Sequence, residues 1–503
     1  MSDAGGTSED IATLAKGGRT NVLGFILRLL ARVPFLFVAG RLYGAETVGR
    51  FALAVVVVEL AALLATLGMK RGLAQALSDA DRPHAHIAWD ALVVALLASL
   101  AASALLFAFP QVMYPSEPPH GLARLLPAIV FAIAWSDVSL AALAYRRNLR
   151  ATVTARAIIE PWTISIAAVL LWPIARHDGL ELSYMLSMLA AVIASLVPFV
   201  RSYGLPRGWK PRLATITALA WRNVPLAGAD AIEWATRNVD RFILGQIFAP
   251  SIVGIYYVAQ QIASLPGRLK TSFDPILGPV ITQSLAAGDK AAVAAQVRQV
   301  GFWIMAAQGC LALMGCIPGE AVMGTVGPQF VAGTAALAFL LIAEVLAATA
   351  SVSESALVYV ARHRNLAISA AMLGVQIALS FAFIYLMRAW DWPLNYQAAG
   401  PALALMLSLG LTSLVKSRLL AHLLGAGVSG WRWQLLGAAL VAIAVGTAFT
   451  SLPHRFEWAE LVFGLPAIAA SYLFVIWRFA FGPADRALFS RLPRSGAKPG
   501  AVG

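Results

Sequence analysis

The chain has 503 residues, of which 59% are hydrophobic and 13% are charged, and its formal net charge at pH 7 is +13. Soluble domains carry roughly a quarter charged residues, so this composition excludes a water-soluble chain of this length and indicates that the bilayer is its solvent. The positive charge does not indicate a nucleic-acid partner, because the basic residues form short clusters between apolar stretches and are not interleaved with aromatics on a polar face.

Fourteen apolar stretches are long enough to span a bilayer, which requires about 20 mostly apolar residues. The sequence therefore predicts an all-α, polytopic membrane protein with fourteen transmembrane helices. The eighth stretch contains Pro266, Pro275 and Pro279, so we expect it to be kinked or split. The fourteen stretches lie near 20–42, 47–69, 87–110, 121–145, 152–174, 180–201, 221–247, 251–285, 300–322, 331–360, 366–388, 397–421, 433–452 and 458–480.

The loops between these stretches predict the orientation of the chain. If the N-terminus is cytoplasmic, most of the 38 Lys and Arg residues fall in inner segments, as the positive-inside rule requires. Removing one helix would move every later basic loop to the wrong side. The sequence therefore predicts fourteen spans with both termini in the cytoplasm. The outer segments hold Arg41, Arg50, Arg124, Arg176, Arg388 and Arg455.

The chain contains an internal repeat. Residues 42–54 (LYGAETVGRFALA) align with residues 247–259 (IFAPSIVGIYYVA) at an offset of 205 residues. The two stretches fall at the same place in two six-helix units. The identical positions are Val48 with Val253, Gly49 with Gly254, and Ala54 with Ala259.

Because six is an even number, the two units enter the membrane in the same orientation. They should form two lobes in a parallel pseudo-two-fold repeat, with a cavity between them, as in alternating-access membrane proteins. Helices 13 and 14 lie outside the repeat. The predicted parts are a cytoplasmic tail (1–18), the N-lobe (19–205), a cytoplasmic linker (206–220), the C-lobe (221–425), helices 13 and 14 (426–481) and a second cytoplasmic tail (482–503).

Helix 1 carries two arginines, Arg28 and Arg32, on one face and near the middle of the membrane. A charge at that depth costs at least about 2.5 kcal/mol and normally faces a cavity or a partner. The planar guanidinium suits the oxygens of a phosphate or diphosphate. No acid lies on the same helix, which favours substrate contact over ion pairing between helices, although that alternative stays open.

Helix 7 is the most highly charged span, with the sequence GADAIEWATRNVDRFILG. Arg237 corresponds to Arg32 at the offset of 205, so each lobe contributes an arginine from its first helix. Arg237 and Arg241 are therefore further candidates for substrate binding. The alternative for Arg237 is an i,i+4 ion pair with Glu233, which would only hold helices together.

Several acids also lie within predicted spans. We interpret six of them as candidates for coupling to an H⁺ or Na⁺ gradient, and structural ion pairing is the alternative. Glu344 and Glu354 on helix 10 are further intramembrane acids. The six coupling candidates are Asp230, Glu233, Asp240, Glu59, Asp137 and Glu160.

Motifs of enzymes are missing from the sequence, which has no Walker sequence, no GxSxG, no HExxH and no DxD in an outer loop. His84 and His86 alone do not make a metal site. We therefore predict no catalytic residue, no bound metal and no cofactor.

Two stretches resemble a known family. They are the YG-x-E-x-x-G-x-F-x-x-A pattern after helix 1 and NVDRFILG…VGIYYVAQQIASLP at 238–266. Together with the 6+6+2 helices, they resemble the polysaccharide-transport branch (Wzx-type oligosaccharide flippases) of the MOP superfamily, which also holds MATE drug exporters and lipid II flippases. The resemblance covers about residues 16–480. The first pattern consists of Tyr43, Gly44, Glu46, Gly49, Phe51 and Ala54.

The resemblance implies a flippase in the bacterial cytoplasmic (inner) membrane. It would carry an undecaprenyl-diphosphate-linked oligosaccharide from the cytoplasmic to the periplasmic leaflet, for synthesis of O-antigen, capsule or exopolysaccharide. The implied partners are this polyprenyl diphosphate, membrane lipid, H⁺ or Na⁺, and polysaccharide polymerase machinery. Arg28 and Arg32 match the family's cavity arginines in kind and helix. Helices 13 and 14 are expected to form a groove for the lipid tail, as in the lipid II branch.

Two other functions remain as alternatives. An ion-coupled exporter of drugs or small metabolites with the same fold would have an anionic cavity, and the arginines count against it. A polysaccharide polymerase or ligase would carry a large outer loop with catalytic residues, whereas every outer connection here is short.

Overall fold

The computed structural model describes residues 33–79, 82–116, 118, 121–267, 274–451 and 457–486. These residues form helices and no strand, which confirms the predicted all-α class. A helix satisfies its interior backbone hydrogen bonds within its own segment, so each apolar stretch can cross hydrocarbon without unpaired backbone groups.

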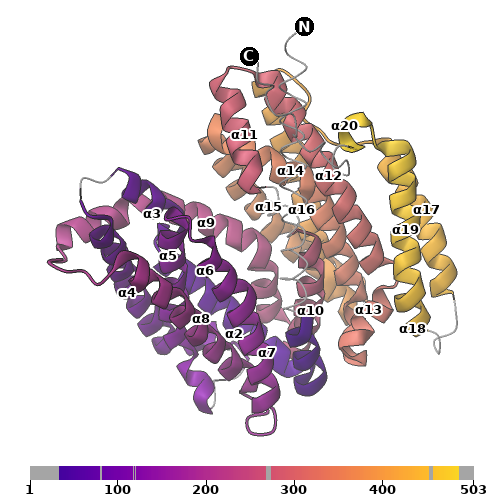
Figure 1. Cartoon of the computed structure of the whole chain (residues 1–503). Coiled ribbons are helices and arrows are strands. Elements are labelled where there is room, and N and C mark those ends of the chain that lie inside the picture. The colour runs from indigo at the N-terminus through magenta and orange to yellow at the C-terminus, as the bar shows by residue number, and fades with distance from the viewer. Residues whose placement is uncertain are drawn as a thin grey trace, which may run out of the picture.

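The first group of helices follows residues 33–38, which are helical themselves (Figure 1). Its π-helical segments are η1 and η4, and its 3₁₀ segments are η2 and η3. The bounds are η1 (Ala39–Tyr43), α2 (Gly44–Ala65), α3 (Met69–Ser78), α4 (His84–Ala108), η2 (Pro110–Val112), η3 (Gly121–Ala128), α5 (Ile129–Tyr145), α6 (Leu149–Val153), η4 (Thr154–Ile159), α7 (Glu160–Leu171) and α8 (Gly179–Tyr203).

The second group begins with α9, the longest of the described helices. The predicted eighth span is described as two helices, α10 and α11, on either side of residues 268–273. The bounds are α9 (Leu213–Ile247), α10 (Pro250–Gly267), α11 (Asp274–Ala286), α12 (Lys290–Cys316), α13 (Gly319–Val326), η6 (Pro328–Gly333), α14 (Thr334–Val360), α15 (Arg362–Ala389) and α16 (Leu394–Leu424).

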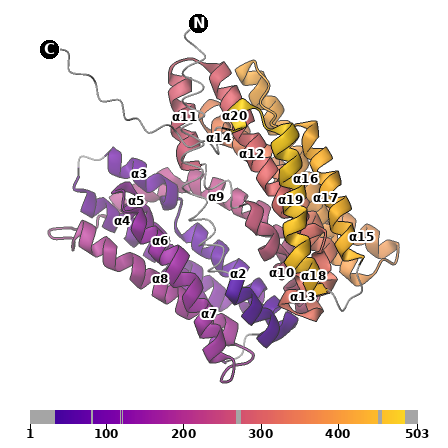
Figure 2. The ribbon, with the colours of Figure 1, turned by 45° about the vertical axis from the view of Figure 1, so that its right-hand side comes forward.

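The last helices form a separate pair that lies against α12 (Figures 1 and 2). A buried apolar cluster joins α12 to this pair. The bounds are α17 (Trp433–Thr450), α18 (Glu457–Ala459), η8 (Glu460–Gly464), α19 (Leu465–Val475), η9 (Ile476–Ala480) and α20 (Pro483–Arg486).

The internal repeat predicted from the sequence is confirmed by the packing. In the N-lobe, α5 packs against α2, α4 and α8, and α8 packs against α7. In the C-lobe, α14 packs against α10, α12 and α16, and α16 packs against α15, so the same pairs recur. A 3₁₀ segment also precedes the central helix of each lobe, η3 before α5 and η6 before α14.

The lobes join through α9 and through a direct contact between α2 and α10. The helix α9 packs against α2, α3 and α4 of the N-lobe and against α10, α15 and α16 of the C-lobe. It begins at Leu213, eight residues before the start that its hydropathy predicts. Both views place α3 and α11 at one end of the molecule and α13 at the other (Figures 1 and 2).

Eleven stretches of the described residues are long and apolar enough to cross a membrane. One of them, Val33–Ser78, contains the end of the first predicted span, from residue 33 onward, and the whole of the second. The seventh and eighth predicted spans are not among the eleven, because α9 carries many charges and α10 contains Gln260 and Gln261. Fourteen spans therefore stays a prediction, while the multi-pass all-helical fold is confirmed.

Candidate functional site

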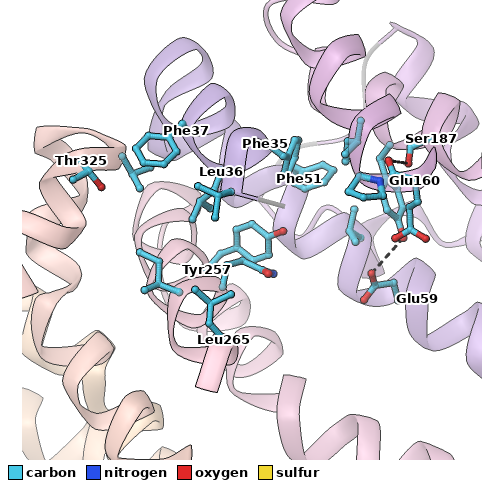
Figure 3. A pocket seen from close by; sticks show the side chains of 18 of the residues that line it. Phe35, Leu36, Phe37, Phe51, Glu59, Glu160, Ser187, Tyr257, Leu265 and Thr325 are labelled. Carbon is cyan, nitrogen blue, oxygen red and sulfur yellow. Dashed lines mark hydrogen bonds between the residues drawn. The ribbon is translucent and has the colours of Figure 1, made fainter. Parts of the chain in front are cut away.

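A cavity of about 270 Å³ lies between the two lobes, where the repeat predicts it (Figure 3). Its walls come from residues 33–37, α2, α7 and α8 on one side and from α10 and α13 on the other. Most lining side chains are apolar. A cluster of rings in its wall crosses the lobe boundary, because the Phe51 ring of α2 meets the Tyr257 ring of α10 edge-on at 6.3 Å.

The polar groups in the cavity wall are few, and two of them are carboxylates. Glu59 of α2 and Glu160 of α7 lie near each other at the same side of the cavity (Figure 3). The Tyr184 hydroxyl donates a hydrogen bond to Glu59 at 3.3 Å, and the Ser187 hydroxyl donates to the backbone carbonyl of Glu160 at 2.7 Å. The described wall is thus apolar and acidic. Arg28 and Arg32, on which the predicted cationic character rests, lie outside the described residues.

Behind this wall, the N-lobe contains a network of ion pairs in which basic and acidic side chains alternate. Arg156 donates to Asp137 of α5 and, at 2.7 Å, to Glu160 one turn further along. Lys70 lies 3.9 Å from the other oxygen of Asp137. The π-helical segment η4 carries Arg156, and Pro161 explains that irregularity because its missing N–H removes a regular helical hydrogen bond.

The acids at the start of the charged stretch of α9 bind a cation from the other lobe. Arg71 of α3 lies 2.7 Å from Asp230 and 2.6 Å from Glu233. The two carboxylates are almost one helical turn apart, so a single guanidinium can reach both. This bridge ties the middle of α9 to the N-lobe.

Arg237 pairs with Glu344 of α14 at 2.6 Å rather than with Glu233. Its side chain is 48% exposed, so it also faces open space. Arg241 is different, because only 5% of it is exposed. Its guanidinium bonds to the side chain of Asn238 and lies 5.4 Å from the centre of the Tyr257 ring, behind the cavity wall.

Asp240 is fully buried next to Arg241 and is held by three donors. It accepts hydrogen bonds from the Tyr256 hydroxyl at 2.5 Å, the Arg241 backbone N–H at 2.8 Å and the Gln260 amide at 3.2 Å. A carboxylate with this many donors is satisfied without a bound ion. Among the described residues, no group of three or more His, Cys, Asp or Glu side chains could hold a metal ion.

A model of polysaccharide biosynthesis proteins matches residues 14–284, which is more than half of the chain. The chain belongs to the polysaccharide biosynthesis protein family. This membership and the fold confirm the predicted place in the polysaccharide-transport branch of the MOP superfamily. No curated protein matches the chain.

Solved structures show the same fold at low sequence identity. The lipid II flippase MurJ in an inward closed conformation is 12% identical, with a TM-score of 0.72, and the match covers 90% of this chain and 98% of that one. An inward-facing MATE-family multidrug resistance transporter of the MOP superfamily is 14% identical, with a TM-score of 0.63, and the match covers 79% and 95%. At these identities the likeness concerns the fold.

Two basic residues of this family member escaped the sequence-based search for site residues. Neither Arg71 nor Arg156 is among the candidates that the sequence predicts, but both bind acids that lie within predicted spans. The spacing of four residues between Arg156 and Glu160 was the available signal. No local signal exists for Arg71, because its partners lie more than 150 residues away in the chain.

The ion pair between Arg237 and Glu344 leads to a first prediction. Replacing either residue with alanine leaves the other without its partner. The double variant should therefore lose less free energy of unfolding than the two single variants lose in sum. We expect a coupling free energy of about 1 kcal/mol. Thermal unfolding of the purified protein in detergent measures it.

The matched control combines Arg237→Ala with Glu46→Ala, which removes an exposed acid from the opposite lobe. Those two losses should be additive. Additive losses for Arg237 and Glu344 as well would contradict the pairing.

Proposed function

We propose that this protein carries an undecaprenyl-diphosphate-linked oligosaccharide from the cytoplasmic to the periplasmic leaflet, for synthesis of O-antigen, capsule or exopolysaccharide. The observation that carries the proposal is the cavity between two repeated lobes in a member of the polysaccharide biosynthesis family. A polar glycan cannot cross hydrocarbon without such a cavity, whereas a polyprenyl tail can remain in the lipid.

The charge of the substrate would also help to drive its movement. A potential of 100 mV, negative in the cytoplasm, favours outward movement of one negative charge by about 2.3 kcal/mol. In this scheme Arg28, Arg32 and Arg237 bind the diphosphate. Arg241, predicted from the sequence to bind it as well, is buried beside the Tyr257 ring, so we assign it the role of positioning Tyr257 in the cavity wall. Exchange of H⁺ or Na⁺ at the intramembrane acids is a further means of coupling.

The same proposal includes the parts and the orientation of the chain. The lobes extend over 19–205 and 221–425, joined by 206–220, and helices 13 and 14 at 426–481 provide a groove for the lipid tail. The chain lies in the bacterial inner membrane with its tails, 1–18 and 482–503, in the cytoplasm. Polysaccharide polymerase machinery receives the product.

One observation favours a second function. The described part of the cavity wall combines aromatic and aliphatic side chains with the carboxylate of Glu59, which lies near Glu160 and its partner Arg156, and this lining suits an apolar cation. Ion-coupled export of a drug or small metabolite is therefore the second candidate.

The test is a second prediction, made in cells that lack this protein. These cells should accumulate a polyprenyl-linked oligosaccharide on the cytoplasmic side, and the wild-type gene should remove it. The Arg28→Ala/Arg32→Ala variant should fail to do so, because the diphosphate loses its permanent cations. Extraction of polyprenyl-linked glycans with and without an impermeant modifying reagent measures the amount and the side.

The matched control is Arg150→Ala/Arg207→Ala, which removes two positive charges from exposed positions on inner segments. That variant should behave as the wild type. If the null strain accumulates no lipid-linked glycan but becomes sensitive to apolar cations, export of such cations replaces the flippase function.

A further inference from the structure

The contact between α2 and α10 is a crossing of two repeat-related helices at two glycines. A Cβ atom built on Gly49 would lie 1.7 Å from the Pro250 carbonyl oxygen and 2.9 Å from the Gly254 backbone nitrogen. A Cβ atom built on Gly254 would lie 1.9 Å from the Ala45 carbonyl oxygen. Real side chains do not approach backbone atoms this closely, so the crossing requires glycine at both positions.

The crossing obeys the two-fold relation of the repeat. At the offset of 205 residues, Gly49 corresponds to Gly254 and Ala45 corresponds to Pro250. Gly49 lies against the carbonyl of Pro250, and Gly254 lies against the carbonyl of Ala45, so the two contacts are equivalent in the repeat. A pseudo-two-fold axis passes through the crossing, and the contact is self-complementary, like the interface of a symmetric dimer.

The crossing lies at the α13 end of the cavity and not in the middle of a lobe. Two hydrogen bonds reinforce the same end, from the Arg41 guanidinium to the Thr325 carbonyl at 3.0 Å and from the Gln329 amide to the Gly40 carbonyl at 3.3 Å. Phe51 follows Gly49 by two residues, and its ring meets the Tyr257 ring edge-on. These two rings form the cavity wall next to the crossing.

We propose that Gly49 and Gly254 are the closing contact of the periplasmic end of the cavity, and that this double-glycine crossing sets the fraction of molecules closed toward the periplasm. Closure needs backbone-to-backbone approach of α2 and α10. A single added methyl group on either helix separates the two lobes at this end and moves the population toward a state open to the periplasm. The proposal relies on the alternating access and the orientation of the proposed function, but not on the identity of the glycan.

The test is a third prediction and uses a cysteine at Val55, a buried residue of the cavity wall beyond the crossing. The native Cys310 and Cys316 are replaced with alanine in the full-length protein. In right-side-out membrane vesicles, an impermeant maleimide should label this cysteine slowly in the parent. Gly49→Ala and Gly254→Ala should each raise the labelling rate at least about tenfold, a shift of about 1.4 kcal/mol toward the open state.

The matched controls are Gly228→Ala and Gly374→Ala, which add the same methyl group to helical glycines where a Cβ meets nothing within 4 Å. They should label at the parental rate. Parental labelling rates in folded Gly49→Ala and Gly254→Ala, as judged by size-exclusion profile and melting temperature, would overturn the proposal.

A second measurement keeps both glycines and remains decisive if the alanine variants do not fold. Cysteines at Ala45 and Pro250 replace the two residues whose carbonyls meet the glycines. Oxidation should cross-link α2 to α10 and protect a third cysteine at Val55 from the maleimide, and reduction should reverse the protection. Efficient cross-linking without protection would refute the gate. The labelling rate does not depend on which glycan is carried. The labelling experiment therefore tests the glycine crossing independently of the accumulation experiment, which tests the flippase function.

Discussion

Arg156→Ala is expected to lower the free energy of unfolding by about 3 kcal/mol, because it removes the cation that two largely buried acids share and leaves Asp137 with the longer, 3.9 Å contact to Lys70. Arg156 binds Asp137 and Glu160 at once, and about a quarter or less of each of these three side chains is exposed. The loss therefore leaves two acids facing each other inside the N-lobe. Thermal unfolding of the purified protein in detergent measures the effect.

The matched control is Arg150→Ala, six residues earlier in the chain and exposed, which should change stability by no more than about 0.5 kcal/mol. A second variant separates charge from geometry. Arg156→Lys keeps the positive charge but cannot reach two carboxylates with one planar group, so its loss should be intermediate. Equal stability of Arg156→Ala and Arg150→Ala would show that Asp137 and Glu160 do not depend on Arg156.

Most of the fold could be predicted because the bilayer imposes one rule on every span. An apolar stretch of sufficient length must be helical, and the positive-inside bias orders the spans. The repeat was visible in a few identities, and the reason for one of them is now clear, because Gly49 and Gly254 meet at the crossing. Short amphipathic helices obey no such length rule, so α3, at Met69–Ser78, was not predicted.

The ion-pair partners of the charged residues are harder to predict from the sequence than the fold is. The sequence identifies Arg237 as too deep for a free charge, but the candidates for its partner include every acid within reach in space. The local choice, Glu233, was one helical turn away, whereas the partner in the structure, Glu344, is 107 residues further along the chain. Glu233 in turn binds Arg71 of the other lobe. Such pairings depend on the helix packing, which composition and spacing do not specify.

The chemical character of the cavity is the other part that sequence reasoning left incomplete. The arginines of helix 1 indicate a cationic cavity, while the described wall brings Glu59 and Glu160 together on an apolar surface (Figure 3). The two carboxylates come from helices that are distant in sequence, and each alone resembles an ordinary intramembrane acid.

The second large effect is expected at Asp485, a buried carboxylate of α20 that connects three parts of the chain. Its Oδ1 accepts hydrogen bonds from the Gln299 side chain and, at 2.8 Å, from the Trp303 indole, both on α12. Its Oδ2 accepts from Arg432 at 2.7 Å, at the start of α17, and from the Gly482 N–H at 2.8 Å. The carboxylate is 1% exposed, so it fastens α17 and α19 to the C-lobe at one end.

Asp485→Ala should therefore release the α17–α19 pair from α12. The expected loss is about 3–5 kcal/mol, since Arg432 then stays partly buried without its counter-charge. Hydrogen exchange in detergent or nanodiscs should show faster exchange at the α20 end of α17 and α19, with the N-lobe unchanged. Asp485→Asn, which keeps the shape but loses the charge, should show a smaller loss, and Glu320→Ala, at an exposed acid, should show none.

The same variant tests whether the pair has a role in transport. If α17 and α19 hold the lipid tail, Asp485→Ala should cause the lipid-linked glycan to accumulate even at a temperature where the rest of the molecule stays folded. Exchange that rises in α17 and α19 without accumulation would show that the pair contributes packing alone. Unchanged exchange would mean that the apolar contacts with α12 hold the pair without Asp485.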